Sequence, residues 1–473
     1  MNYVTINGFG RYRVRKGKIL LDLLIEKSVP ITASCGGRGR CGLCRVKIIG
    51  KIKPPDIIES SLIPQKLLEQ GYRLACRHKI EQNITVTAPM KKRKKSIMST
   101  PSGLALDIGT TVIKGAALNF ETERIKKTKI FNLQNNMGGD IITRISEAIN
   151  GKYTRLRRLL QKSIEELKRE LGVKNPLFTT VVGNPVMLSF YLNKSVKGLA
   201  RFPFESAIDK GVFLKNPARF VFPVIGGFVG GDTIAGILAS GVYKKKKTSL
   251  YIDLGTNGEV VLISNRKITA TSTAAGPAFE GVGLSCGCLA VPGAIERIKF
   301  RNGEFIVQTI KNQPPIGLCA SGLIDLLSLL LTRKALQTNG RLPKTIRLKG
   351  LTITQADIRK LQLAVAAVHT GIQSLLSEFS IEAGELEEAV ITGEFGTKVN
   401  ITALQRIGLL PTGIKKVRFE KDLPLKGAIS ALKDDGVLAQ AEEIRRMSTH
   451  IDLATLPNFQ KVFVNALKLE PWN

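Results

Sequence analysis

The sequence predicts a mixed α/β chain of three folded units, in which a small sheet-and-helix unit precedes two larger lobes of related design. Three observations predict this arrangement. Four cysteines gather within residues 35–76, a strand ending in Asp-x-Gly-Thr occurs at Asp107 and again at Asp253, and a basic, turn-rich segment separates the cysteine region from the first of these strands. At 473 residues the chain has room for about three domains. We expect domains at residues 1–90, 103–247 and 248–473, with a flexible linker at 91–102.

The first unit reads as a short alternation of strands and helices. Hydrophobic spacing with period two predicts strands, and helical spacing predicts two helices. In chain order these are a hairpin of residues 4–6 and 11–14, a helix at 19–26, a strand at 45–49, a helix at 60–70 and a closing strand at 84–88.

Cys35, Cys41 and Cys44 share one glycine-rich loop with the spacing C-x5-C-x2-C, and Cys76 comes from a later strand. Three thiolates on one loop with a distant fourth are typical of a 2Fe–2S cluster. Glycines suit such a loop because they adopt positive φ values and let backbone N–H groups approach the sulfurs. Together with the strand order, the pattern predicts a β-grasp domain of the ferredoxin kind, with the cluster near one surface.

Two other uses of these cysteines are less favoured. A structural zinc site usually pairs C-x2-C with a second such pair or with histidines, and this region has one pair. Disulfides are disfavoured by the odd total of seven cysteines and by a chain start, Met-Asn-Tyr-Val, without a signal peptide.

The sequence predicts no membrane span. Its most apolar stretch, residues 224–242, is rich in glycine and carries Asp232 in its middle. We therefore expect a cytoplasmic protein, in which reduced thiols are normal.

The net charge is +33, from 71 Lys and Arg against 38 Asp and Glu. A basic surface favours encounter with an acidic protein partner. The alternatives are lysine usage of the whole lineage without a specific role, and nucleic-acid binding. Nucleic acid is disfavoured because the basic residues are scattered, aromatic residues are only 6% and no groove-reading motif is recognisable.

The linker combines a run of lysine and arginine at 91–95 with the turn-rich sequence Ser-Thr-Pro-Ser-Gly at 99–103. This composition favours a solvated hinge over a nuclear-localisation signal. A hinge would let the cysteine-bearing unit move.

Each of the two repeated strands leads through a tight glycine turn into a second strand. Glycines let backbone N–H groups approach phosphate oxygens, threonine and asparagine add donors, and aspartates hold Mg²⁺ through water. One such hairpin is common, but two at domain spacing favour ATP bound between two lobes. The expected phosphate ligands are Gly109, Thr110, Thr111, Gly255, Thr256, Asn257 and Gly258, with Asp107 and Asp253 around Mg²⁺.

A third element, at 388–396, is a strand that passes into a glycine turn and then a helix, which allows adenine or ribose to lie against the backbone. The three elements resemble the phosphate-1, phosphate-2 and adenosine motifs of the ASKHA superfamily of acetate kinase, sugar kinases, Hsp70 and actin. The resemblance implies two RNase H-like lobes, and Asp232 as the candidate base for the attacking water, with lobe packing as its alternative role. It also implies that the nucleotide pocket includes Gly276, Glu280, Ser321, Gly322, Gly393 and Gly396.

The whole chain resembles the reductive activators of corrinoid proteins, which join an N-terminal 2Fe–2S domain to an ASKHA ATPase. The segments that carry this resemblance are 35–44, 183–187, 226–232, 274–281, 317–325, 354–362, 392–400 and 407–411. It implies ATP-dependent transfer of one electron from the cluster to the Co(II) of a corrinoid protein, which regenerates Co(I) for methyl transfer. A low-potential electron donor and a homodimer are implied as well.

The energetics agree with a fused ATPase. Plant-type clusters lie near about −400 mV, the Co(II)/Co(I) couple usually lies lower, and each 100 mV corresponds to roughly 2.3 kcal/mol per electron. ATP hydrolysis can offset a shortfall of a few hundred millivolts. The rival classes are a small-metabolite kinase with a regulatory cluster, for which no substrate motif is evident, and an Fe–S sensor that binds nucleic acid.

Three further cysteines, Cys286, Cys288 and Cys319, could ligate a second metal. Since no fourth ligand is in view, we expect buried and inert thiols.

Overall fold

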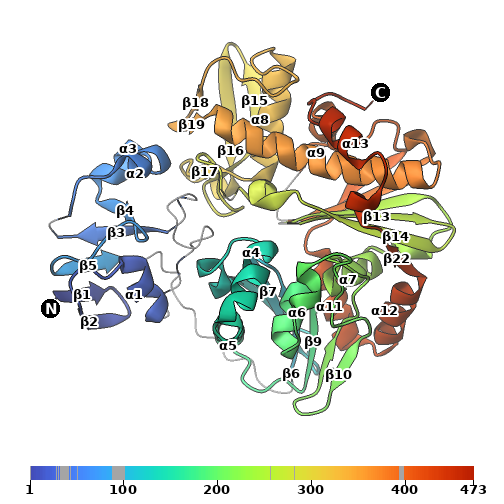
Figure 1. Ribbon diagram of the computed structural model, residues 1–473, viewed down its shortest axis with the longest axis horizontal. Helices are drawn as coiled ribbons and strands as arrows, with labels where there is room; N and C mark the ends of the chain where they lie inside the picture. The colour runs from blue at the N-terminus through green and yellow to red at the C-terminus, as the bar shows by residue number, and fades with distance from the viewer. Residues whose placement is uncertain are drawn as a thin grey trace.

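The computed structural model describes residues 2–27, 29, 31, 42, 44–50, 52–87, 102–255, 257–281, 283–393 and 399–472. Across these residues the strands form five sheets, and the chain divides into a small unit at its N-terminal end and two larger α/β lobes (Figure 1). The predicted fold class, a β-grasp unit followed by a two-lobed α/β part, is confirmed.

The first unit is a five-stranded sheet in the order β2-β1-β5-β3-β4. Its strands are β1 (Asn2–Ile6), β2 (Gly10–Val14), β3 (Arg45–Ile49), β4 (Tyr72–Leu74) and β5 (Ile84–Thr87). Helix α1 (Leu20–Glu26) buries Leu20, Leu21, Leu23 and Leu24 in the core of this unit. A β1–β2 hairpin and a parallel β1–β5 pair are the pairings that a β-grasp unit requires.

The expectation of one helix at residues 60–70 is wrong. The structure has two short helices, α2 (Ile57–Leu62) and α3 (Gln65–Glu69), which meet at Pro64. Proline lacks an N–H group and disfavours helical geometry in the residue before it, so a helix ends there. Asp56 and Glu59 form a capping box that begins α2.

The first lobe has a six-stranded sheet in the order β10-β11-β9-β6-β7-β8. Helix α5 (Tyr153–Leu171) covers one face and buries Leu156, Leu160 and Leu167, which recur at helical spacing. The strands are β6 (Ser102–Ile108), β7 (Val112–Asn119), β8 (Ile125–Phe131), β9 (Phe178–Gly183), β10 (Val212–Leu214) and β11 (Arg219–Val221), and the shorter helices are α4 (Ile141–Glu147) and α6 (Pro185–Leu192).

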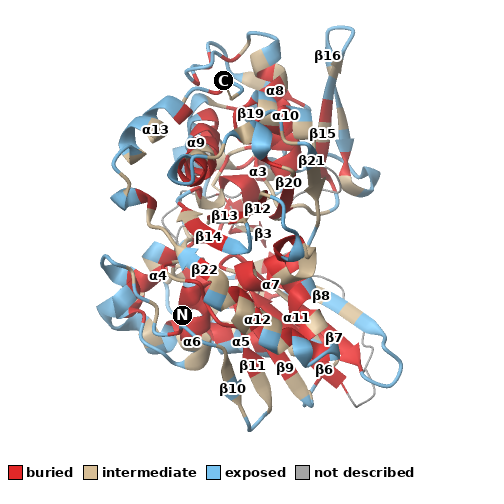
Figure 2. Ribbon diagram, turned by 90° about the vertical axis from the view of Figure 1, so that its right-hand side faces the viewer, coloured by how far each residue is buried: buried red, intermediate tan, exposed pale blue. Residues whose placement is uncertain are grey.

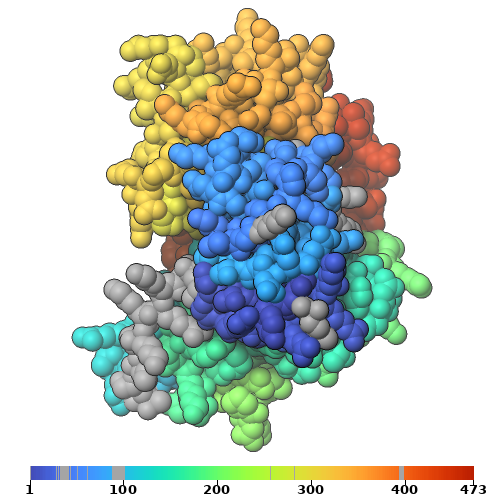
Figure 3. Space-filling model, turned by 90° about the vertical axis from the view of Figure 1, so that its left-hand side faces the viewer, coloured from blue at the N-terminus to red at the C-terminus, as the bar shows by residue number. Residues whose placement is uncertain are grey.

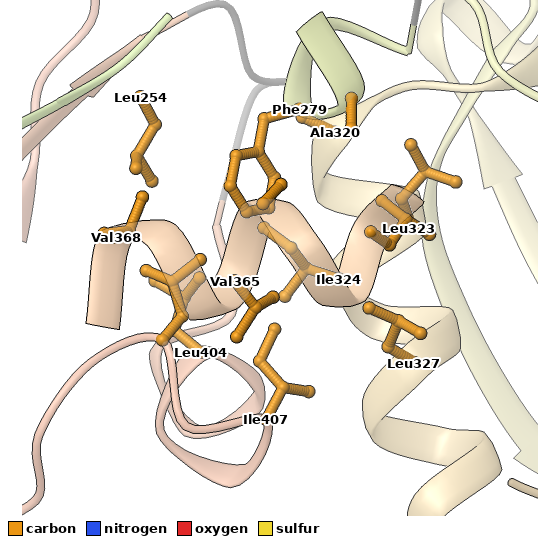
Figure 4. Close-up of a cluster of buried hydrophobic side chains, with 14 of the residues drawn as sticks. Leu254, Phe279, Ala320, Leu323, Ile324, Leu327, Val365, Val368, Leu404 and Ile407 are labelled. Carbon is orange, nitrogen blue, oxygen red and sulfur yellow. The ribbon is translucent and has the colours of Figure 1, made fainter. Parts of the chain in front are cut away.

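The second lobe has a six-stranded sheet in the order β21-β20-β12-β13-β14-β22. Helix α9 (Gln355–Glu378) and helix α8 (Ala320–Thr332) supply much of the core on its outer face, where Phe279, Ile324 and Val365 meet (Figure 4). The strands are β12 (Ser249–Leu254), β13 (Gly258–Ser264), β14 (Lys267–Thr273), β20 (Glu388–Gly393), β21 (Lys416–Phe419) and β22 (Ser448–His450).

Smaller elements surround this lobe. A three-stranded sheet has the order β16-β15-β17, and β18 pairs with β19. Their bounds are β15 (Ala294–Arg301), β16 (Glu304–Thr309), β17 (Gly317–Leu318), β18 (Ile346–Leu348) and β19 (Leu351–Ile353), and the remaining helices are α10 (Ile401–Arg406) and α13 (Phe459–Ala466).

Three helices lie in the core between the two large sheets: α7 (Gly231–Ser240), α11 (Leu423–Lys433) and α12 (Gly436–Met447). Buried residues run along both sheets and through these helices (Figure 2). Helix α11 follows strand β21 of the second lobe in the chain yet packs on β6 and β9 of the first lobe, where the Thr180 hydroxyl donates to Ala428 O at 2.7 Å. A Cβ on Gly427 would lie 2.2 Å from Ala235 O, so α7 and α11 approach closely through this glycine.

The first unit lies on one side of the molecule, at the height where the two lobes meet (Figures 1 and 3). The charge of Arg45, at the start of β3, acts on the Cys288 thiol of the second lobe and opposes the rise in its pKa. The β3 edge of the first unit therefore faces the second lobe. None of the helices in the described part of the chain combines the length and apolar character needed to cross a membrane.

Candidate nucleotide cleft and cluster site

The first glycine turn joins β6 to β7. The two strands pair antiparallel up to Ile108 and Ile113, so residues 109–112 make the turn, and Val112 also pairs with Phe131 of β8. A Cβ on Gly109 would lie 2.5 Å from Val112 O, which leaves room for glycine alone. Asp107 shares the strand face of Ala105, and Ala105 packs in the core between the two sheets. The Asp107 carboxylate is thereby directed toward the second lobe.

The second turn joins β12 to β13 in the same way. Asp253 shares the face of Tyr251, which also packs in the core between the sheets. Asp253 stands directly opposite Glu259 on β13 and Thr392 on β20. Because directly paired residues project to the same side of a sheet, these three side chains form one row toward the first lobe.

The two turns converge on one cleft that is partly open to solvent. The cleft is lined by Asp107, Gly109, Thr110, Thr111, Val112, Lys114, Asn184, Asp232, Asp253, Gly255, Asn257, Glu259, Glu280, Thr392, Gly393 and Pro424.

Ten of the residues expected from sequence meet in this lining: Asp107, Gly109, Thr110, Thr111, Asp232, Asp253, Gly255, Asn257, Glu280 and Gly393. Four others lie outside it. A Cβ on Gly258 would lie 2.5 Å from Thr273 Oγ1, and one on Gly322 would lie 2.2 Å from Ile295 O, so both glycines permit close packing. Ser321 is buried beside Cys319, and Gly276 begins a 3-10 helix with φ of 68°. Thr256 and Gly396 fall outside the described residues.

Sequence reasoning missed six residues of the lining, among them Lys114, Asn184 and Glu259. Lys114 pairs with Asp107 in the β6–β7 register. The alternation of side chains along β7 could therefore have indicated that Lys114 faces the cleft. Asn184 caps helix α6 and donates from Nδ2 to Thr110 Oγ1 at 3.1 Å. Glu259 follows the second turn directly, at the position that pairs with Asp253.

The carboxylates of the cleft perturb one another. Burial, and then the charges on Asp107 and Asp253, raise the pKa of Asp232 to about 8. Burial, and then Asp232 and Asp253, raise the pKa of Glu259 well above its ordinary value. Asp232 sits in the first turn of α7, directly after the glycine pair that begins this helix. A carboxyl group with a pKa near neutrality suits proton exchange with water.

The chemistry of the lining fits a nucleotide with its cation. Five carboxylates line the cleft, whereas the described lining contains the ammonium group of Lys114. Buried carboxylates in this number need a cation, and oxygen ligands are those that Mg²⁺ prefers. The buried Oγ1 of Thr392, next to Asp253, has no hydrogen-bond partner among the residues that the structure describes and is available to a ligand.

The cluster site lies at one end of the β3–β4 pair. Arg45 pairs with Leu74, and the Ala75 N–H donates to Cys44 O at 2.9 Å, which extends the ladder by one residue. Cys44 and Cys76, distant in sequence, therefore emerge at the same edge. Arg45 Nε donates to Gly42 O at 2.7 Å and holds the end of the cysteine loop. Cys35 and Cys41 fall outside the described residues.

These two thiols fit a cluster. Cys44 is buried and Cys76 is half-buried, so soft sulfur ligands are held at a sheltered edge. Helix α1 begins beside them, where the Leu21 N–H donates to Ala75 O at 2.9 Å. The donor set at this edge suits iron better than a hard cation.

Cys286, Cys288 and Cys319 lie in the second lobe, and none of them forms a disulfide with a cysteine that the structure describes. Burial raises the pKa of all three thiols, that of Cys288 to about 12. They are therefore protonated at neutral pH. Cys286 and Cys319 are buried, as the sequence predicted, whereas Cys288 is half-buried.

Family models match almost all of the chain. Residues 4–81 match the 2Fe-2S iron-sulfur cluster binding domain, residues 102–245 match the RACo middle region, and residues 247–472 match the C-terminal domain of RACo, the ASKHA domain.

Two curated proteins are similar over most of their length. The corrinoid activation enzyme RamQ of Eubacterium limosum is 32% identical over 427 residues, which cover 80% of this chain and 71% of that protein. The Co(II) methylated amine-specific corrinoid protein reductase of Methanosarcina barkeri is 26% identical over 410 residues, which cover 76% of each.

A solved structure shares the fold. The reductive activator for corrinoid, iron-sulfur protein superposes with a TM-score of 0.73 at 22% identity and covers 100% of this chain and 99% of that one. The first unit alone is similar to a component of the Na⁺-translocating NADH-quinone reductase of Chlamydia caviae, at 34% identity over 71 residues, or 15% of this chain and 16% of that protein.

Proposed function

The chain belongs to the family of corrinoid activators that carry the RACo domains, and from this premise we propose that it performs the ATP-dependent reductive activation of a corrinoid protein. One electron passes from the first unit to Co(II) of the partner, and Co(I) is regenerated for methyl transfer. The observation that supports the ATP requirement is the convergence of two glycine turns and three aspartates on one cleft between the lobes.

In this proposal the first unit is the electron carrier. A 2Fe–2S cluster held by Cys35, Cys41, Cys44 and Cys76 supplies one-electron chemistry at low potential. The protein shelters two of these thiols at the β3–β4 edge, and it needs a low-potential donor to recharge this unit. We expect a partner with an acidic surface, since the net charge of +33 would steer it toward this protein. A homodimer, as the resemblance implies, belongs to the same proposal.

The two lobes bind and hydrolyse ATP. Thr110, Thr111 and Asn257 offer donors to the phosphates, and Gly109 and Gly255 let the backbone come close. Asp107 and Asp253 would hold Mg²⁺, which supplies neutralisation of phosphate charge. Asp232 is the proposed acceptor of a proton from the attacking water, a role that its place in the cleft lining beside Asp107 and Asp253 supports. Mg²⁺ held by these two aspartates would offset the charges that raise the pKa of Asp232, and so would favour its ionised, basic form.

The test follows the visible spectrum of a Co(II) corrinoid protein mixed with this protein and a low-potential reductant, without oxygen. Co(I) should appear when ATP is added and stay absent without it. Co(I) formation that ignores ATP would rule out energy coupling. A colourless protein that carries zinc would rule out the redox role altogether.

A further inference from the structure

The carbonyl groups of the first glycine turn rest on a layer of buried polar side chains. Asn132, Asn135 and Arg144 are 1%, 1% and 0% exposed. Asn132 and Asn135 come from the segment between β8 and helix α4, and Arg144 comes from α4 itself. Neither the motifs nor the proposed mechanism uses these residues. Their hydrogen bonds run from Asn132 Nδ2 to Gly109 O at 3.0 Å, from Arg144 Nη2 to Thr110 O at 2.6 Å, and from Asn135 Nδ2 to Thr111 O at 2.8 Å.

These three hydrogen bonds fix the direction of three peptide units. In a planar trans peptide the C=O and the following N–H point in opposite directions. With the carbonyls of residues 109–111 held in the buried layer, the N–H groups of Thr110, Thr111 and Val112 are directed away from it. All three of these residues line the cleft. The buried layer therefore turns a row of backbone donors toward the place where an anion would lie.

Arg144 also carries a charge beneath this turn. Every hydrogen-bond acceptor of its guanidinium that the structure describes is neutral. These acceptors are Thr110 O, Gln134 Oε1, Asn135 Oδ1, Gly138 O and Met187 Sδ. Burial lowers its pKa to about 9, against the charges of Asp140 and Glu280, so the group stays protonated at neutral pH. A buried charge is costly unless an anion compensates it.

The guanidinium suits this place better than an ammonium group would. Its planar fork reaches acceptors on several sides at once, whereas lysine offers a single point of charge. Gly138 is part of the arrangement, because Arg144 Nε donates to its carbonyl oxygen. A Cβ on Gly138 would lie 2.7 Å from Cγ2 of Thr143, the residue just before Arg144, so a larger residue would disturb this contact.

We infer that Arg144, with Asn132 and Asn135, is a positioning residue for the phosphates of the nucleotide: it presents the backbone donors of residues 110–112 and places a positive charge beneath them. Arg144 itself does not touch the nucleotide, because Thr110 and Asn135 occupy its Nη2 side. The inference rests on the proposed function, in that it takes a nucleotide to occupy the cleft.

The test compares ATP with adenosine, which shares the base and sugar but has no phosphate. Affinities of the full-length protein for each are measured by calorimetry in the presence of Mg²⁺. Arg144→Gln should weaken ATP binding about tenfold or more, which is about 1.4 kcal/mol, and leave adenosine within about twofold. Arg144→Lys keeps the charge and should recover part of the ATP affinity. In turnover, KM for ATP should rise more than kcat falls.

A second variant keeps the inference testable if Arg144→Gln fails to fold. Asn135→Asp keeps the shape of the side chain and still accepts a hydrogen bond from Arg144 Nη2, which becomes an ion pair. The new carboxylate cancels the buried positive charge and cannot donate to Thr111 O. It should also weaken ATP and spare adenosine. Unchanged ATP affinity in folded Asn135→Asp or Arg144→Gln would overturn the inference.

Arg73 provides the matched control. It is buried in the first unit and donates to the neutral acceptors Leu68 O and Tyr72 O, at a place remote from the cleft. Arg73→Gln should leave both affinities unchanged, and an equal loss of ATP affinity there would overturn the inference. A wild-type protein that binds no ATP would instead refute the proposed function itself.

Discussion

The ammonium group of Lys114 lies 2.7 Å from Asp422 Oδ1, and this ion pair joins strand β7 of the first lobe to the start of helix α11. Lys114 lines the cleft. The ion pair therefore keeps at the wall of the cleft a positive charge that a phosphate group could attract. The side chain of Lys114 is 13% exposed and that of Asp422 is 39% exposed, which makes Asp422 the more accessible partner for substitution.

Asp422→Asn should tighten ATP binding by about two- to fivefold, because Lys114 loses a competing anion. Asn suits the left-handed backbone of this position, where φ is 55°, so the midpoint of thermal unfolding should stay within about 2 °C. Calorimetry and a thermal scan check both values. The matched control is Glu123→Gln, which breaks the Lys433–Glu123 pair between α11 and the first lobe away from the cleft lining. Weaker ATP binding in Asp422→Asn would contradict the prediction.

Cys76→Ser should abolish the visible absorption of the cluster and electron delivery to the corrinoid partner, because oxygen is a poor substitute for a soft thiolate ligand. ATP affinity should stay within about twofold, since Cys76 belongs to the first unit and the cleft to the lobes. Absorption spectra and calorimetry are the measurements. Cys288→Ser is the control and should keep the spectrum; a cluster that survives in Cys76→Ser would show that another residue is the fourth ligand.

Asp232→Asn should lower the ATPase rate about 10²- to 10⁴-fold, the range lost with a general base. The amide has the same shape but cannot take a proton from water. ATP affinity should change little, because the lost interaction belongs to the transition state. Steady-state ATPase assays and calorimetry separate the two effects. Loss of binding with an unchanged rate at saturation would instead assign Asp232 to packing between the lobes.

The raised pKa of Asp232 predicts a pH dependence of stability in nucleotide- and metal-free protein. The pKa rises from an ordinary 3.8 to about 8 on folding, so the folded protein retains a proton that the unfolded chain releases between these values. Its contribution to stability is thus fully present below pH 3.8 and is lost as the pH rises toward 8. Denaturant unfolding between about pH 5.5 and 8 should show the free energy of unfolding falling, by at most about 1.4 kcal/mol per pH unit for this proton. In Asp232→Asn the slope should be smaller, and an identical slope would disprove the assignment.

Gly427→Ala should lower the free energy of unfolding by about 1–3 kcal/mol, the usual effect of overpacking. The added Cβ would lie 2.2 Å from Ala235 O and must force α7 and α11 apart. Denaturant titration measures the change. Gly384→Ala is the control, because a Cβ there meets nothing within 4 Å, and it should be close to neutral. Equal stability of the two variants would mean that α7 and α11 can separate without cost.

The sequence-based predictions succeeded where a local pattern sufficed. The turns at Gly109 and Gly255 are visible in sequence because each is a contiguous run of Asp-x-Gly-Thr after an apolar strand, and at Gly109 the glycine is required sterically. Asp232 could be joined to them through the resemblance to a known superfamily. Alternation revealed the other strands of the first unit, but β4 could be inferred only as a strand near Cys76, without bounds, because three residues are too few for a periodic pattern.

The missed residues depend on pairing between distant segments. Lys114 and Glu259 reach the cleft through strand register, and Thr392 joins them through the parallel pairing of β20 with β12. Some glycines were predicted to lie in the cleft but do not. Gly322 resembles Gly109 in sequence, but its missing Cβ makes room for Ile295 O within the second lobe. A sequence cannot tell which neighbour a glycine accommodates.

The position of helix α11 has a consequence for synthesis of the chain. The first lobe has its last strand by residue 221, yet helix α11, which packs on β6 and β9 of its inner face, begins at residue 423. At translation rates of about 5–20 residues per second, that face waits on the order of tens of seconds for its cover. During this interval the apolar side of β6 and β9 is a target for chaperones and for wrong partners. The final stretch of the polypeptide therefore decides whether the nascent first lobe reaches its native state.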